Sequence, residues 1–466
     1  MPARPSALAR FEACLRAEAD PRAALAAGII GAETRIETAT GPKKLVYADY
    51  VASGRALVQV EDFMRDAVLP FYANTHTDSS FCGATSTALR EEARETIARL
   101  CGAPRDEHAV IFSGSGATSG LNHLVHLLDL SGSLAQGDAV TVLIGPYEHH
   151  SNILPWRESG ARVEEIGEAP AGGPDMAALE AALARAPAGR VIVAMSAASN
   201  VTGIRADVAA ITALVKGFGA TMVWDYAAGA PYLPMTMAPA KGAGIDAIVF
   251  SPHKFIGGPG ASGVLIVRRG AVRARRPWRT GGGTVAYVSK TRHDYLTGLE
   301  HREEGGTPNV LGDIRAALAL IVKDVIGQAF MDERNTALSA RAFAAWGDDP
   351  AIGLLAAEHR DRLPIFSFTP RAGSVIDPSA FTTALSRHYG IQARGGCACA
   401  GPYGHRLLHI DAARAEVLRR RILAGHEDEK PGFVRLNFSV LMTPETVDYI
   451  LESVKRLTRQ WRTLAA

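Results

Sequence analysis

Short segments that are apolar at almost every position alternate with segments of helical periodicity between residues 87 and 270. The apolar segments cover residues 109–113, 139–144, 190–195, 220–224, 245–250 and 263–267. Helices are predicted over 87–100, from Gly116 through Leu128, from Asp175 to Ala184 and over 206–215. A strand without polar positions has both faces buried, as in parallel sheets that helices cover. The pattern therefore predicts an α/β fold around a mostly parallel sheet.

The pattern changes after a long apolar helix predicted over 310–325. Strands are predicted over 363–368 and 433–438, and helices over 380–388 and 443–457. This mixture indicates a smaller α+β domain. With 466 residues, 47% of them hydrophobic, the chain is long enough for more than one core. We expect an N-terminal helical segment (1–46), a large α/β domain (47–310), and a connecting helix with a small domain (311–466).

Charge and composition argue against several classes of protein. The net charge of +2 lacks the basic excess that nucleic-acid binding usually brings, and no apolar stretch is long enough for a membrane span. Residues Met1 to Ala26 are predicted to form an amphipathic helix rather than a signal or transit peptide. Five scattered cysteines indicate a reducing compartment, and we expect a cytoplasmic protein without nucleic-acid or membrane partners.

Lys254 lies in the segment Ser251-Pro252-His253-Lys254, directly after an apolar strand and before a glycine-rich stretch. Asp225 ends another apolar segment 29 residues upstream. A pyridoxal phosphate (PLP) enzyme needs a lysine that forms a Schiff base with the cofactor and a carboxylate that keeps the pyridine nitrogen protonated. Most lysines are solvated surface residues. The small neighbours and the position at a strand end favour the PLP role instead.

Three further segments follow strands, at the edge where open α/β sheets bind ligands. Ser113 to Thr118 opens a helix and predicts a phosphate cradle, the alternative being an ordinary glycine-rich turn. His149 could stack on a pyridine ring and relay protons, or belong to a polar loop. Asn200 could bind the cofactor's phenolate oxygen, although a role in a turn is at least as plausible.

A glycine-rich loop, Arg394 to Pro402, carries a guanidinium and two thiols, Cys397 and Cys399. Arginine suits a substrate carboxylate, and an exposed thiolate suits attack on sulfur. The cysteines could be incidental, or could bind a metal with His405 and His409. Because the spacing is not a usual zinc spacing, we predict thiol chemistry and no metal.

Six segments carry a family resemblance that covers most of the chain from Tyr47 onward. They are Tyr47–Ser53, Glu148–Trp156, Ser251–Lys254, Gly281–Thr284, Arg302–Asn309 and Arg394–Cys399. They resemble the class V aminotransferase superfamily of fold-type I PLP enzymes. The closest likeness is to group II cysteine desulfurases and selenocysteine lyases, with a secondary likeness to molybdenum cofactor sulfurases. The resemblance implies a seven-stranded sheet in the large domain.

The resemblance also implies roles for individual residues. The implied cofactor-binding residues are Gly116, Ala117, Thr118, His149, Asn200, Asp225, Ser251, His253, Lys254 and Thr284. Thr284 would reach the phosphate site of a partner subunit, which implies a homodimer with shared sites. The implied substrate-binding residues are Arg394, Ala52 and Asn200. Lys254, His149, Cys399 and Cys397 would be catalytic, with Cys399 carrying the persulfide.

The chain departs from the family pattern at three places, one of which is an extension of the cysteine loop over Gly401–Arg406. The family usually has a glutamine three residues after the aspartate, where this chain has Ala228, so the phenolate oxygen would lose one hydrogen-bond partner. Cys397 and Ala398 stand where desulfurases usually have histidines before the cysteine, and this Cys-x-Cys arrangement is closer to the sulfurases.

Three functions are compatible with these features. The leading hypothesis is PLP-dependent cleavage of a C–S or C–Se bond in a cysteine-like amino acid, giving alanine and an enzyme persulfide. A sulfur-acceptor protein or small molecule would then receive the sulfur. The second is another class V reaction, such as transamination, epimerisation or β-elimination, with incidental thiols. The third is a sulfur carrier or metal-binding protein that is not an enzyme.

Overall fold

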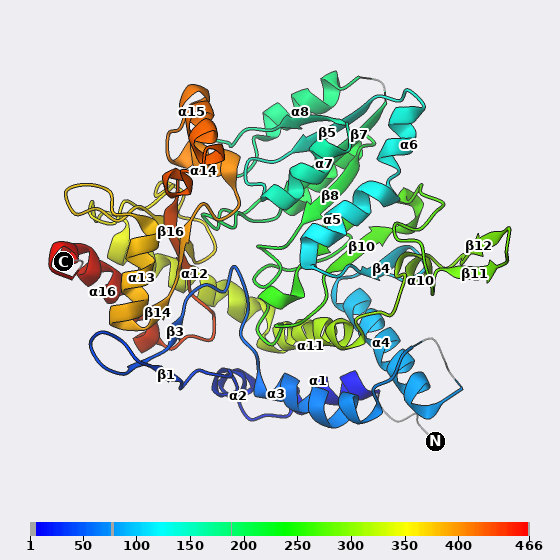
Figure 1. Cartoon of the computed structure of the whole chain (residues 1–466), viewed down its shortest axis with the longest axis horizontal. Helices are drawn as coiled ribbons and strands as arrows, with labels where there is room; N and C mark the ends of the chain where they lie inside the picture. Colours follow the sequence, from blue (N-terminus) through cyan, green and yellow to red (C-terminus); the bar gives the residue numbers. More distant parts are fainter. Residues whose placement is uncertain (1–5, 76–78, 188, 465–466) are drawn as a thin grey trace.

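A seven-stranded sheet forms the centre of the computed structural model, which describes residues 6–75, 79–187 and 189–464 (Figure 1). The strand order is β4-β10-β9-β8-β7-β5-β6, and only β10 runs antiparallel to its neighbours. The strands are β4 (His108–Phe112), β5 (Val140–Ile144), β6 (Arg162–Glu165), β7 (Arg190–Ser196), β8 (Thr221–Asp225), β9 (Ala247–Phe250) and β10 (Val264–Arg268). The predicted α/β fold with a mostly parallel sheet is confirmed.

Helices cover both faces of this sheet because successive side chains of a strand point to opposite faces. On β10, Leu265 and Val267 pack against one set of helices, and Val264 and Ile266 against the other. The first set is α5 (Gly116–Leu127), α6 (Leu130–Ala135) and α7 (Leu154–Glu158). The second set is α4 (Phe81–Leu100), α8 (Met176–Arg185), α9 (Val208–Gly217) and α11 (Val310–Ile326). The uniformly apolar strands of the sequence are thus buried on both sides.

A smaller part of the molecule follows α11 and has a core of its own. Its central sheet has the order β13-β16-β15. Its elements are α12 (Gln328–Trp346), β13 (Ile365–Phe368), α13 (Pro378–Tyr389), β14 (Ile391–Gln392), β15 (Arg394–Gly396), α14 (Gly401–Leu407), α15 (Ala412–Leu423), β16 (Phe433–Asn437), α16 (Pro444–Arg459) and α17 (Trp461–Leu464). The sequence did not predict α12, α14 or α15, because none of them carries a clear apolar stripe.

The N-terminal segment runs along both parts of the molecule. Its elements are α1 (Ala7–Arg16), α2 (Pro21–Ala27), β1 (Arg35–Ile36), β2 (Lys43–Lys44), β3 (Val46–Tyr47) and α3 (Val58–Phe63), which a π-helical turn, Met64–Val68, follows. The single helix predicted between Met1 and Ala26 is wrong, since Asp20 caps a new helix at Pro21. Residues 1–5 of that prediction lie outside the described residues. β3 pairs with β14, so the segment after residue 45 joins the smaller core.

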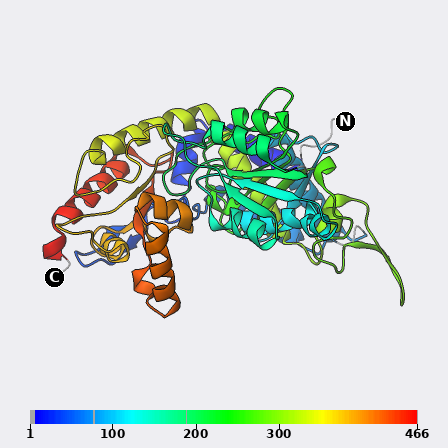
Figure 2. The ribbon, with the colours of Figure 1, turned by 90° about the horizontal axis from the view of Figure 1, so that it is seen from above.

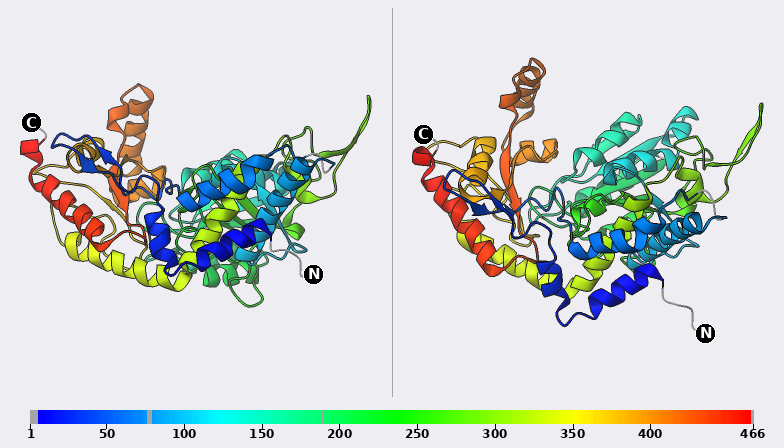
Figure 3. Two further views of the ribbon diagram at one scale, coloured as in Figure 1. Left: turned by 90° about the horizontal axis from the view of Figure 1, so that it is seen from below. Right: turned by 60° about the horizontal axis from the view of Figure 1, so that its bottom comes forward.

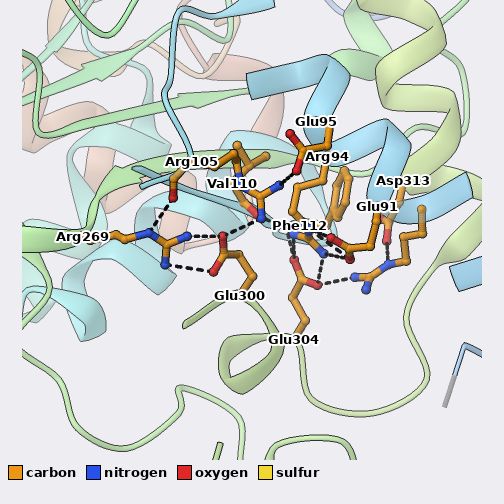
Figure 4. A network of polar contacts seen from close by, with 11 residues as sticks. Glu91, Arg94, Glu95, Arg105, Val110, Phe112, Arg269, Glu300, Glu304 and Asp313 are labelled. Carbon is orange, nitrogen blue, oxygen red and sulfur yellow. Dashed lines mark hydrogen bonds and ion pairs between the residues drawn. The ribbon is translucent and has the colours of Figure 1, made fainter. Parts of the chain in front are cut away.

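A buried ion-pair network ties the large part together (Figure 4). Glu304 follows α10 (Leu299–Glu303) and accepts hydrogen bonds from Arg94 and from the Phe112 amide. It also pairs with Arg90, which in turn binds Asp313 on α11. Although burial raises the pKa of Glu304, the Arg94 and Arg90 guanidinium groups lower it to about 2. The network holds α4, α11 and the edge strand β4 in one arrangement.

Two segments project from the body. A hairpin of β11 (Val285–Val288) and β12 (His293–Tyr295) extends at one end, and α15 projects sideways from the smaller part (Figures 2 and 3). None of the helices in the described parts of the chain combines the length and the apolar character needed to cross a bilayer.

Candidate active site

A cleft lies at the carboxyl ends of the central strands, which is where open α/β sheets bind ligands. The predicted site residues that line it are Ala117, Thr118, His149, Asn200, Asp225, Ser251, His253 and Lys254. These side chains come from segments that end or follow five strands, β4, β5, β7, β8 and β9. Their meeting at one edge of the sheet follows from the parallel arrangement of β5, β7, β8 and β9.

Lys254 ends a short 3₁₀ turn, Pro252–Lys254, that follows β9 directly. Gly54 packs against the backbone of the next residue, Phe255, so closely that a Cβ on Gly54 would lie 1.7 Å from the Phe255 carbonyl oxygen. Burial lowers the pKa of Lys254 to about 8, although the Asp225 carboxylate raises it. A lysine amine with such a pKa is partly neutral near pH 7 and can act as a nucleophile.

Asp225 ends β8 and is buried, with only 3% of its surface exposed. One carboxylate oxygen accepts a hydrogen bond of 2.8 Å from the Ala227 amide. Burial raises the pKa of Asp225, whereas that amide and the Lys254 ammonium lower it. A buried carboxylate at the floor of a cleft suits a cationic ring nitrogen of a ligand.

The amino end of α5 forms a cradle for an anion at the other side of the cleft. Gly116 adopts a φ of +68°, and a Cβ there would lie 2.7 Å from the Ser251 hydroxyl. That hydroxyl accepts the Ala117 amide, and the Thr118 hydroxyl lies 2.6 Å from the Ser151 hydroxyl. The helix dipole and the hydroxyl groups of Thr118, Ser151 and Ser251 therefore converge where a phosphate would be stabilised.

His149 lies on the wall of the cleft, directly before the 3₁₀ turn His150–Asn152. Its Nδ1 accepts the Ser151 amide at 3.1 Å, which fixes the ring. Burial and, after it, the charge of Lys254 lower the pKa of His149 to about 4. The imidazole is therefore neutral near pH 7, so it can lie against an aromatic ring without adding charge.

Glu148 organises this wall from behind, a role that the sequence did not reveal. Its carboxylate accepts the Ser196 amide at 2.8 Å and the Ser196 hydroxyl at 2.7 Å, and it also accepts the Asn152 amide. Asn152 in turn accepts the Trp156 indole N–H at 2.9 Å. The i, i+4 spacing of Glu148, Asn152 and Trp156 in the sequence was the signal, because it aligns these three side chains in a chain of hydrogen bonds.

The cysteine loop after β15 packs onto the mouth of the cleft. The Asn200 side-chain amide donates to the Ala398 carbonyl at 2.9 Å, and the His150 amide donates to the Cys399 carbonyl at 2.9 Å. Cys397 and Cys399 are both exposed, free thiols. The Asn200 N–H predicted for the cofactor's phenolate thus binds the loop, while its buried Oδ1 has no partner. The phenolate contact stays a prediction.

Arg394, predicted to bind a carboxylate, belongs to an arginine pair that the sequence missed. β15 places Arg394 opposite Arg435 of β16. Asp49 lies between them, with one oxygen 3.0 Å from Arg394 and the other 2.9 Å from Arg435. Arg435 is buried and also donates to the Asn200 carbonyl at 3.1 Å. Only the fold brings Asp49 and Arg435 together, since 386 residues separate them.

Other predicted site residues do not line the cleft. Thr284 is buried at the base of the β11–β12 hairpin, where its hydroxyl donates to the Gly281 carbonyl at 2.6 Å. Ala52 lies in the turn after Asp49. Their roles toward cofactor and substrate stay predictions, and that of Thr284 requires a second subunit. In the described parts of the chain, no three His, Cys, Asp or Glu side chains are arranged to hold a metal ion.

The family model and the similar proteins of known sequence point to the same family. The aminotransferase class-V family matches residues 46–450. A probable cysteine desulfurase of Vibrio cholerae is 29% identical over 88% of this chain and 93% of its own length. One of Aeropyrum pernix is 30% identical over 83% of this chain and 92% of its own.

Two solved structures are similar over most of the chain. The apo cysteine desulfurase of Thermococcus onnurineus covers 89% of this chain and 94% of its own, with a TM-score of 0.72 and 23% identity. A cysteine desulfurase of Escherichia coli, described as an S-sulfonic acid form, covers 88% of this chain and 94% of its own, with a TM-score of 0.69 and 25% identity.

Proposed function

Because the chain belongs to the aminotransferase class-V family, whose members are PLP-dependent enzymes, we propose that it removes sulfur or selenium from a cysteine-like amino acid. The products are alanine and a persulfide on the enzyme. The observation that carries this proposal is the docking of the thiol loop onto the cleft of Lys254, through Asn200 and His150. The names of the relatives agree with it.

The cleft matches the chemistry of PLP at both ends. The amino end of α5, with Thr118, Ser251 and His253, would hold the phosphate, and buried Asp225 would hold the ring nitrogen. When bound, PLP supplies an aldehyde for the Lys254 amine and a ring that withdraws electrons from the substrate. The neutral His149 ring would cover one face of it.

The residues of the chain then have distinct tasks. Arg394 orients the substrate carboxylate, because a guanidinium binds carboxylates through two parallel hydrogen bonds. Lys254 takes the proton from the α-carbon and returns a proton to the product, and its pKa of about 8 suits both transfers near neutral pH. The Cys399 thiolate bonds to the substrate sulfur, the C–S bond breaks, and its electrons stay with the carbon, which is protonated to give alanine.

One observation favours a second candidate, which is another class V reaction with incidental thiols. Both cysteines of the loop are exposed, and neither lines the cleft around Lys254. A β-elimination would need Lys254 and Arg394 but neither thiol. Its product from cysteine is pyruvate instead of alanine.

The proposal extends to assembly and location. Thr284 would complete the phosphate site of a second subunit, so the active form would be a homodimer with two shared sites. The sulfur on Cys399 would pass to a protein or small-molecule acceptor. All five cysteines are free thiols, which suits a reducing compartment such as the cytoplasm.

A direct test combines product analysis with one substitution. Purified protein incubated with L-cysteine should give alanine, and its visible absorbance should disappear with borohydride, leaving a reduced adduct on Lys254. Cys399→Ala should reduce alanine formation at least tenfold, while Cys14→Ala, which removes an exposed thiol far from the cleft, should not change it. Undiminished alanine from Cys399→Ala would reject the nucleophile, and pyruvate as the product would favour the second candidate.

A further inference from the structure

The chain reverses direction between the two thiols of the cysteine loop. The Ala400 amide donates to the Cys397 carbonyl at 3.4 Å, and the two residues between them, Ala398 and Cys399, have φ values of +50° and +54°. Positive φ at both central residues is the geometry of a type I′ turn, in which glycine and asparagine are the preferred residues. Alanine and cysteine adopt it only at a cost of about 1–2 kcal/mol each.

The contacts that dock the loop compensate for this cost. Both strained residues offer their carbonyl oxygens to the main body, Ala398 to the Asn200 side chain and Cys399 to the His150 amide. The Gly401 amide donates to the His150 ring at 2.9 Å, which holds the chain beyond the turn. Strained backbone that the surroundings impose is typical of functional sites.

The turn also sets the distance between the two thiol-bearing residues. Alternate Cα atoms on a helical backbone, left-handed or right-handed, are separated by roughly 5.4 Å, whereas on an extended chain they are roughly 7 Å apart. Only the shorter distance lies within the usual range for a disulfide. Both cysteines are exposed and free.

We propose that Cys397 is a resolving thiol that releases the sulfur of the Cys399 persulfide as hydrosulfide and forms a Cys397–Cys399 disulfide. This inference rests on the proposed function, since it begins from a persulfide on Cys399. The two cysteines have different positions: the Cys399 backbone is bound to the wall of the cleft, and Cys397 directly follows β15. Cys399 therefore accepts the sulfur and Cys397 displaces it.

The step balances as a thiol–disulfide exchange. The Cys397 thiol loses its proton, and its sulfur attacks the Sγ of Cys399. The bond between that Sγ and the terminal sulfur breaks, and the terminal sulfur leaves with the electron pair as hydrosulfide. The sulfane sulfur is reduced, the two cysteines are oxidised, and a dithiol reductant must return them to thiols before the next cycle. A disulfide across one residue is strained and exposed, so a dithiol should reduce it readily.

A single-turnover experiment tests this directly. Holoenzyme receives less than one equivalent of L-cysteine per subunit, with no added thiol, and alanine, sulfide and protein mass are measured. Wild-type protein should release sulfide equal to the alanine and become lighter by two hydrogen atoms. Cys397→Ser should still form alanine but retain the sulfur, and should become heavier by one sulfur atom. Sulfide release by Cys397→Ser at the wild-type level would overturn the proposal.

The outcomes separate this proposal from the one on which it rests. Absence of alanine in both proteins would mean that the desulfurase function fails, whereas alanine with a stable persulfide in the wild type would mean that only the resolving role fails. Cys14→Ser is the matched control, because it removes another exposed thiol and should behave as wild type.

A second measurement does not depend on the cofactor or on turnover. Protein titrated with a dithiol–disulfide buffer should show a two-electron couple that joins Cys397 to Cys399, identified by peptide mass. The couple should be lost in Cys397→Ser and in Cys399→Ser, and kept in Cys14→Ser. Failure of the wild type to form this intramolecular disulfide would also overturn the proposal.

Discussion

The carboxylate of Asp49 lies between two guanidinium groups, those of Arg394 and Arg435. Arginines opposite each other on neighbouring strands would repel, and Asp49 removes that repulsion. Arg435 is only 4% exposed, so its charge depends on this partner, while Arg394 is half exposed and can accept a substrate carboxylate. Asp49 would thus serve both the fold and the proposed orientation of the substrate by Arg394.

Asp49→Asn should therefore reduce both stability and substrate affinity. Leaving the buried Arg435 without a carboxylate partner should lower the free energy of unfolding by about 3 kcal/mol, and KM should rise because Arg394 loses its orientation. Urea unfolding and steady-state kinetics measure the two effects. Glu33→Gln, which removes an exposed pair with Lys44, is the control and should cost less than about 1 kcal/mol. Equal costs for the two variants would contradict this account.

At the scale of elements, the ion pairs that hold the helices and the edge strand together lie outside the cleft. α4 binds α11 and β4 through Arg90, Arg94 and Glu304, yet none of these residues lines the cleft. The segment from Arg302 to Asn309 resembles a family motif, but Glu304 within it has a structural role. Its carboxylate accepts the Phe112 amide and so anchors the edge strand β4. A recognisable motif is therefore not by itself a set of catalytic residues.

Glu304→Gln should destabilise the protein by about 3–5 kcal/mol at pH 7, because Arg90 and Arg94 remain buried with less negative charge. The folded pKa of Glu304 is about 2 and its ordinary value is 4.5, so its stabilising contribution is present above pH 4.5 and is lost as the pH falls toward 2. The stability difference between wild type and variant should accordingly shrink in acid, as measured by urea unfolding from pH 7 to 3. Glu95→Gln, at an exposed partner of Arg105, is the control. A pH-independent difference would contradict the role of the charge.

At the scale of the whole molecule, the two cores are joined where α11 ends and α12 begins. Gly327 forms this junction with a φ of +88°, which lets one helix follow another without a loop. The candidate active site spans the junction, since Lys254 follows β9 of the large sheet, whereas Arg394 and the cysteine loop belong to the smaller part. The N-terminal strand β3 makes a second connection by pairing with β14.

Gly327→Ala should lower the free energy of unfolding by about 1–3 kcal/mol, because residues with a Cβ rarely adopt that conformation. Steric contact is not the cause, since the nearest atom to an added Cβ is an Arg22 nitrogen at 3.8 Å. Gly217→Ala is the matched control: its φ is not in the positive region and its Cβ would meet nothing within 4 Å, so it should be neutral or stabilising. Thermal unfolding of both variants distinguishes a conformational cost from a general effect of alanine.

Local patterns in the sequence were sufficient for six of the seven strands of the sheet, for most of its covering helices, and for the residues that directly follow strands. The edge strand β6 was not predicted, because it is charged and lacks an apolar run, and neither were the short helices α6 and α7. Apolar runs report burial on both faces, and the carboxyl ends of parallel strands must share an edge, which brings Thr118, His149, Asp225 and Lys254 together. The role of Gly116 could likewise be predicted from the sequence, because a tight turn before a helix requires glycine.

The tertiary structure alone decided the contacts between residues far apart in the chain. Asp49 meets Arg394 and Arg435, and Asn200 binds the loop of Cys399, because the N-terminal segment and the smaller core fold back onto the sheet. Such contacts leave no periodic signal, since each depends on how two elements pack. The left-handed turn at Ala398 and Cys399 was hidden for the same reason: neither residue prefers that conformation, and only the docking contacts stabilise it.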